Sequence, residues 1–102
     1  MDLDLDDALR RTIGGDQQAR ALVLTMADDG REPIALAMAA VLSGDATRLP
    51  DAARLATSTR DRQIVAIASA HIAGDRELVS ALARDHLVDY PDSLIVAWLA
   101  GR

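Results

Sequence analysis

The stretch that decides the fold runs from Thr57 to Ala100 and reads TSTRDRQIVAIASAHIAGDRELVSALARDHLVDYPDSLIVAWLA. Three apolar-rich runs alternate in it with two turn signals: Gln63–Ala73, Gly74-Asp75, Arg76–Val88, Tyr90-Pro91-Asp92 and Leu94–Ala100. The apolar residues within the runs recur at helical spacing, and Gly and Pro mark the breaks between them. The stretch therefore predicts helix, tight turn, helix, tight turn, helix, and no residue pattern in it points to catalysis.

The dipeptide Gly-Asp recurs about thirty residues apart along the whole chain. It stands at Gly15-Asp16, Gly44-Asp45 and Gly74-Asp75. Gly readily adopts the left-handed conformation that ends a helix, and Asp can cap the next helix by accepting a backbone N–H bond. Each pair therefore predicts the end of one helix and the start of the next, at a spacing typical of helical-hairpin repeats.

These signals divide the chain into about seven helices. We expect them at about residues 4–13, 17–27, 33–42, 50–57, 61–73 and 75–88, and from 92 onward. The fourth is the least regular, because Pro50 would cost about 3 kcal/mol in a helix interior. We therefore expect residues 45–49 to form a separate turn and this helix to begin at Pro50. The other expected caps are Asp61 and Asp92, each close to the start of a helix.

The composition supports helices and excludes several functions. Half of the residues are hydrophobic, but aromatic residues make up only 2% of the chain, so Ala, Leu, Val and Ile must form the core. Ala has the best helix propensity, whereas sandwiches and barrels favour β-branched and aromatic residues. The net charge is −5 without any Lys, which disfavours nucleic-acid and anionic-membrane binding. The chain has no Cys, which removes disulfides, thiolate catalysis and Cys-based zinc sites.

The sequence predicts one domain, residues 1–102, in the cytoplasm. Its start, Met1–Asp7, is acidic where a signal peptide would be basic. The longest apolar run, Ile34–Leu42, is about half of the ~20 residues that span a bilayer.

The unit from Arg60 to Ser93 resembles a tetratricopeptide repeat, a helix-turn-helix of thirty-four residues. Residues 57–94 are most similar to the tetratricopeptide repeat protein 38 family, through the Thr- and Arg-rich lead-in at 57–62, Gly74-Asp75 and the ending at 89–92. The sequence departs from that family at Ile64, where His is usual, and at His71, where an aromatic is usual.

The resemblance implies a fold and a general role. It places Ala66, Ile67 and Ala70 of one helix against Val79, Ala83 and His86 of the next, with Pro91 at the terminal proline of the repeat. It also implies protein binding, and it transfers no catalytic residue.

Side chains that commonly carry chemistry do not form a site in the sequence. In an antiparallel hairpin His71 and His86 would differ by roughly 12 Å in axial level, too far to share a metal ion. The carboxylates coincide with expected caps and turns, no Ser has a His three or four residues away, and no Gly pattern leads into a Lys. We therefore expect no catalytic, cofactor-binding or metal-binding residues, and no enzymatic activity.

One group of residues is a candidate partner-binding face. In tetratricopeptide arrays the first helix of each hairpin lines the concave side. When the hairpins are aligned at their Gly-Asp turns, one residue from each of these first helices falls into a column along that side. The column and its neighbours are Ile34, Met38, Val41, Ile64, Ala68, His71, Leu94 and Trp98. Such an apolar face indicates a partner site. Alternatively, these side chains are the core of a small closed bundle.

We expect an all-α helical-hairpin solenoid that acts as a protein-binding scaffold or adaptor. Repeat arrays normally end on a helix with a polar outer face, but Leu94–Leu99 is apolar on nearly all sides. Another surface should therefore pack against it. We therefore predict a homodimer through this helix. The alternative is a small ligand-binding or enzyme-accessory domain with an apolar pocket between the third, fifth and seventh helices. A helix-turn-helix DNA binder is disfavoured by the acidity.

Overall fold

The computed structural model describes residues 4–101, with the side chain of Asp6 excepted, and this part of the chain is helical without strands. Residues 1–3, part of the acidic start, and Arg102 lie outside the described residues. The helices are α1 (Leu5–Ile13), α2 (Gln17–Asp29), α3 (Pro33–Ser43), the 3₁₀ turn η1 (Ala46–Arg48), α4 (Leu49–Leu55), α5 (Thr59–Ile72), α6 (Arg76–Asp89) and α7 (Leu94–Ala100). The prediction of an all-α fold with about seven helices is confirmed over this range.

The three Gly-Asp pairs are the junctions between helices, as predicted. Gly15, Gly44 and Gly74 have φ angles of +95°, +72° and +76°, a region that glycine adopts without steric cost. The backbone N–H of each following Asp donates to the carbonyl five residues earlier: Asp16 to Arg11 at 2.9 Å, Asp45 to Ala40 at 3.2 Å, and Asp75 to Ala70 at 3.0 Å. These bonds are the 6→1 bonds of the Schellman motif, so each Asp helps to end the helix before it.

The carboxylate of each of these aspartates also starts the element that follows. Oδ1 accepts backbone N–H groups of the next turn: Gln18 at 2.9 Å and Ala19 at 3.1 Å for Asp16, Thr47 at 2.9 Å for Asp45, and Leu78 at 3.1 Å for Asp75. One residue thus satisfies an otherwise unpaired carbonyl on one side and an unpaired N–H on the other.

Two of the predicted caps are wrong. Helix α5 begins at Thr59, and its cap is Ser58, whose Oγ accepts the Asp61 backbone N–H at 3.0 Å. Asp61 therefore lies inside the first turn, where its negative charge still complements the helix dipole. At α7 the cap position is Ser93, which makes no capping bond through its side chain, so Asp92 lies outside the helix.

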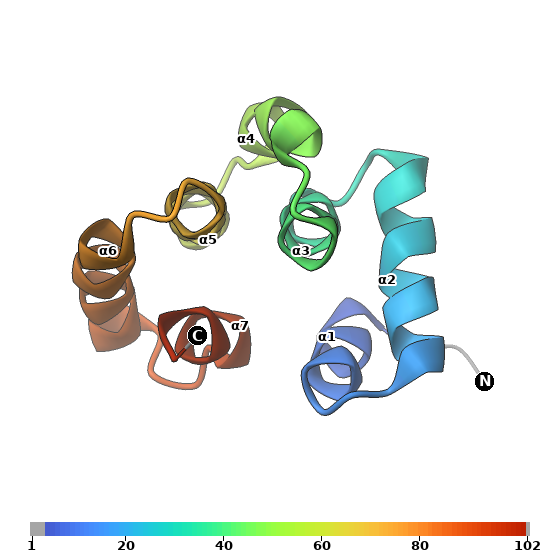
Figure 1. Cartoon of the computed structure of the whole chain (residues 1–102), viewed down its shortest axis with the longest axis horizontal. Helices are drawn as coiled ribbons and strands as arrows, with labels where there is room; N and C mark the ends of the chain where they lie inside the picture. The colour runs from blue at the N-terminus through green and yellow to red at the C-terminus, as the bar shows by residue number, and fades with distance from the viewer. Residues whose placement is uncertain (1–3, 102) are drawn as a thin grey trace.

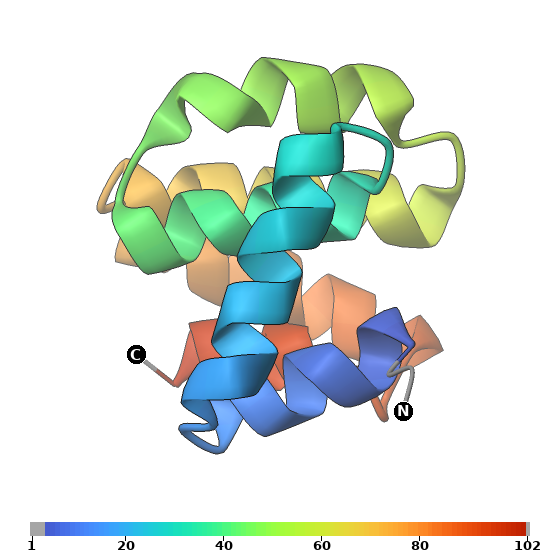
Figure 2. The same cartoon turned by 90° about the vertical axis from the view of Figure 1, so that its right-hand side faces the viewer.

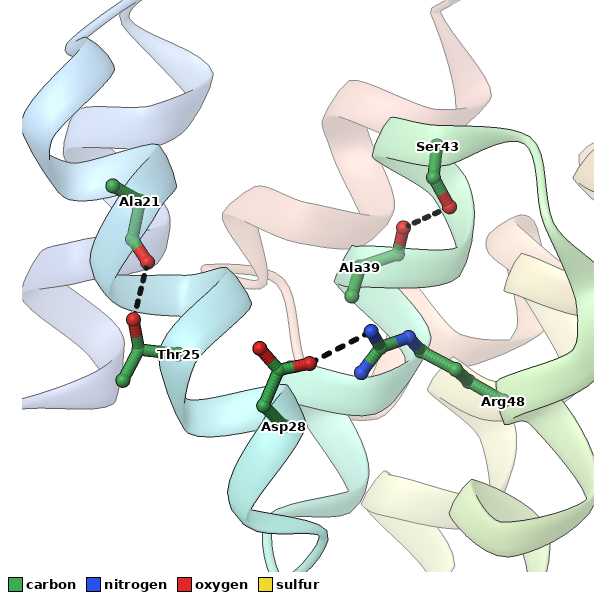
Figure 3. A network of polar contacts seen from close by, with 6 residues as sticks. All are labelled: Ala21, Thr25, Asp28, Ala39, Ser43 and Arg48. Carbon is green, nitrogen blue, oxygen red and sulfur yellow. Dashed lines mark hydrogen bonds and ion pairs between the residues drawn. The ribbon is translucent and has the colours of Figure 1, made fainter.

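The late start of the fourth helix is confirmed in outline. A separate 3₁₀ turn, η1, precedes α4, and Pro50 occupies the first turn of α4, where its missing N–H costs nothing. The bond from the backbone N–H of Thr47, and then one from its side chain, lowers the pKa of the Asp45 carboxyl. The turn is also tied to the end of α2 through an exposed ion pair, Arg48 Nη2 to Asp28 Oδ1 at 2.8 Å (Figure 3).

The helices form a closed arrangement in which α1, α3, α5 and α7 lie inside and α2, α4 and α6 lie outside (Figure 1). Contacts run from α1 to α2, α2 to α3, α3 to α5, α5 to α7, and from α7 back to α1. Figure 2 shows α2 crossing between the layer that contains α3 and the layer that contains α1 and α7. The first and last helices therefore meet, and the chain folds into a body of 37 × 25 × 24 Å.

The core has a central part and an Ala-rich part. The central part lies among the inner helices, and its largest fully buried side chains include Met38, Ile64, Ile67 and Leu99. The second part joins α3 to α4 and α5 mainly through small residues: Ala35, Ala37, Ala39, Ala40, Ala52, Ala56 and Ala68. In α3 every residue from Ile34 to Ala40 is buried, because neighbouring helices surround it. Ala at these positions allows the surrounding helices to approach closely.

The capping role of Asp75 gives a direct test of the junctions. Asp75→Ala removes the bond to the Leu78 N–H, and we expect the free energy of unfolding to fall by about 1 kcal/mol in urea denaturation. Asp92→Ala is the matched control, because Asp92 is exposed and caps no helix. An equal loss in both variants would show that general charge effects, rather than the cap, account for the change.

Candidate functional site

The predicted partner-binding face is divided between the core and the surface. Ile34, Met38, Ile64 and Ala68 are buried, at 5%, 0%, 0% and 0% exposure. Val41, His71 and Trp98 are half-buried, and Leu94 is 47% exposed. Ile34, Met38 and Ile64 lie in the central core, where Val41 and Trp98 pack against them, while Ala68 belongs to the Ala-rich part. Most of the predicted face thus lies in or against the core, whereas His71 and Leu94 belong to neither part of it.

Other helices of the same chain pack against α7 and bury part of its surface. It contacts α5, α6 and α1, and Ile95, Val96 and Leu99 are buried. The contact with α1 was not predicted from the sequence. On α1, Ala8 and Leu9 are buried, at 0% and 6% exposure. The surface that remains for a partner on α7 includes Leu94 and part of Trp98.

Five of the six residues that the resemblance places between α5 and α6 are buried. Ile67 and Ala70 of α5 and all three predicted residues of α6, namely Val79, Ala83 and His86, are buried. Ala66 is instead exposed and lines a groove of about 350 Å³ between the two helices, with Thr59, Arg62, Gln63, Leu82 and Asp85. A second, apolar groove of about 450 Å³ lies between α4 and the C-terminal end of α5, lined by Ala46, Leu49, Pro50, Ala53, Ser69, Ile72 and Ala73.

His86 is a fully buried histidine in the α5–α6 interface. Its Nδ1 lies 2.7 Å from Oε1 of Gln63, and this oxygen can only accept, so Nδ1 carries the proton. Its Nε2 is buried and has no hydrogen-bond partner among the groups that the structure describes. The ring also stacks against Tyr90 at a centroid distance of 4.8 Å. This arrangement suits a neutral imidazole with a structural role.

The environment of His86 disfavours its charged form. Burial lowers the pKa of His86, and the nearby Arg60 charge lowers it further, while Asp89 acts in the opposite direction. A buried cationic imidazole would also lack an acceptor for its second N–H.

The fold should therefore lose stability as the medium becomes acidic. Because the pKa is lowered in the folded chain, the unfolded chain takes up the proton first, and the contribution of His86 is complete above about pH 6.5. Below this value we expect it to decline by up to about 1.4 kcal/mol per pH unit. Urea denaturation at several pH values would measure this decline, and His86→Gln should make it shallower. An unchanged slope in the variant would contradict the assignment.

A polar pocket of about 340 Å³ lies where α1, α5 and the α6–α7 turn meet. Its walls come from three distant parts of the sequence: Leu9 and Arg10, Arg60, and the residues Tyr90, Asp92, Ser93, Leu94 and Ile95. Sequence reasoning missed this pocket, because it depends on the return of α1 to α7. Between α3, α5 and α7, where a ligand pocket was predicted, buried side chains of the central core lie together.

Metal ligands and membrane-spanning helices are two further kinds of feature that bear on function. No group of three or more described His, Asp or Glu side chains is placed to hold a metal ion. None of the helices described is both long and apolar enough to cross a bilayer.

Comparisons with protein-family models, with curated proteins and with solved structures find no match for this chain. The tetratricopeptide resemblance therefore stays a prediction that rests on the residues quoted above.

Proposed function

We propose that this chain is a non-enzymatic protein-interaction module, built from helical hairpins in the manner of tetratricopeptide repeats, that self-associates through the exposed side of α7. The observation that carries the proposal is the distribution of exposed large apolar side chains. Those on the described surface are Leu78, Val88 and Leu94, at 44%, 76% and 47% exposure. Val88 and Leu94 lie on either side of the α6–α7 turn and carry the proposal, whereas Leu78 lies near the start of α6.

The pairing of helices supports the hairpin part of the proposal. α1 packs on α2, α3 on α4 and α5 on α6, and one helix of each pair lies inside (Figure 1). The α5–α6 pair, which carries the resemblance, buries His86 and its neighbours Val79 and Ala83 as that resemblance implies. The contact between α1 and α7 closes the arrangement, which departs from an open solenoid. A partner would therefore bind at the outer surface.

The local geometry of α7 supports self-association. Leu94 and Trp98 are four residues apart and therefore neighbours on one face of the helix. Leu94 is exposed and Trp98 is half-buried, so both contribute apolar surface beside the α6–α7 turn. Val88 is exposed in the last turn of α6, just before the same turn. In a two-fold dimer the same patch is used by both copies, so a self-complementary apolar patch is sufficient.

A charge placed in this patch tests the proposal. We expect the wild-type chain to be a dimer at tens of micromolar in light scattering, and Leu94→Asp to be a monomer with an unchanged helical circular dichroism spectrum. The matched control is Leu78→Asp, which introduces the same charge at a residue of similar exposure, toward the other end of α6, and should remain a dimer. A monomeric wild type at this concentration, or dimer loss in both variants, would contradict the α7 interface.

A second candidate function is that of a small ligand-binding domain. The pocket beside Arg10 and Arg60 favours it, because a pocket of about 340 Å³ falls within the size range of small-molecule sites.

A further inference from the structure

We propose that the pocket between α1, α5 and the α6–α7 turn binds a small ligand through an oxyanion group, a carboxylate or a phosphate. The proposal does not rest on self-association, because all the residues that line the pocket belong to one chain. It rests on two cations, a buried hydroxyl without a partner, and an apolar wall, which the fold brings together from distant parts of the sequence.

The two arginines supply positive charge within an acidic protein. The chain carries a net charge of −5, yet Arg10 from α1 and Arg60 from α5 line the same pocket. Arg10 has no ion-pair partner among the side chains that the structure describes, a set that leaves out Asp6, and Arg60 bonds to its neighbour Asp61 through Nη1 at 3.2 Å. A guanidinium has five N–H donors, so that bond leaves most of the Arg60 donors available for a ligand. Guanidinium groups match carboxylate and phosphate oxygens in geometry.

Ser93 provides the neutral part of the site. It lines the pocket and is 7% exposed, and within the described residues its Oγ has no hydrogen-bond partner. Buried hydroxyls almost always have a partner, so one without it calls for an explanation. It also makes no capping bond at the start of α7, although it occupies the cap position. Because this Oγ is itself buried, it reaches an oxyanion in the pocket only when the Ser93 side chain rotates toward it, and that bond would then complete its hydrogen bonding.

The remaining walls define the rest of the ligand. Leu9 and Ile95 are buried side chains that line the pocket, which favours a ligand with a short apolar part beside its charged group. Tyr90 forms another wall, and its stacking against His86 holds the ring in place. Asp92 also lines the pocket, and its carboxylate repels an anion. The repulsion from Asp92 predicts a variant that should bind more tightly than the wild type.

The test is a calorimetric titration of the folded chain at low salt with two probes, malonate and inorganic phosphate. We expect saturable binding of at least one probe. We expect Arg10→Gln and Arg60→Gln each to weaken it by about tenfold or more, because each removes a charged hydrogen-bond donor. Ser93→Ala should weaken it less, and Asp92→Asn should strengthen it. The stronger of the two probes identifies the carboxylate or the phosphate as the preferred group.

The matched control is Arg11→Gln. Arg11 is the neighbour of Arg10 on α1, is exposed, and does not line the pocket, so its loss makes the same change in net charge outside the site. It should leave the affinity unchanged. Absence of binding to the wild type by both probes at millimolar concentration would overturn the proposal, as would an equal loss of affinity in the Arg10→Gln and Arg11→Gln variants. Circular dichroism of each variant separates loss of binding from loss of fold.

Discussion

The double use of one residue at each helix junction is the constraint on which this structure depends. At Asp16, Asp45 and Asp75 the backbone N–H closes the preceding helix and the carboxylate opens the next element. A left-handed glycine directly before each aspartate makes the sharp change of direction possible without strain. Because the end of one helix and the start of the next element are adjacent in the sequence, the connections are short. Each junction therefore restricts the angle at which the next helix packs.

The small residues of the core make this tight geometry possible. Between α3, α4 and α5 the buried residues are mostly Ala, which allows the backbones to approach closely. Larger side chains, such as Met38, Ile64 and Leu99, lie at the centre, where the inner helices meet. Large side chains at the centre and small ones between α3, α4 and α5 let a short chain with little aromatic content enclose a core.

Local features of this fold were predictable from the sequence, and its long-range features were not. The Gly-Asp junctions, the separate turn before Pro50 and the inward face of α6 follow from local conformational preferences and periodicity. The caps at Asp61 and Asp92 were wrong because a serine stands near each, and the choice between the two depends on where the helix begins.

The contact between α1 and α7 depends on the summed angles of every junction, which no local pattern records. Ile34, Ile64 and Trp98 were predicted as a group, and the structure places the first two in the central core with Trp98 packed against it, which is the alternative that the sequence left open. The pocket beside Arg10 and Arg60 was missed because it depends on the contact between α1 and α7.

The meeting of α1 with α7 also changes how the chain should come apart. In a linear repeat array each unit touches only its neighbours, so the end units can fray while the middle persists. Here the contacts form a cycle from α1 through α2, α3, α5 and α7 back to α1, so neither terminal helix is a free end. Detaching one of them exposes apolar surface on the other as well. The two ends of the sequence therefore belong to one cooperative unit, and denaturation is expected to be a single transition rather than a progressive loss of helices.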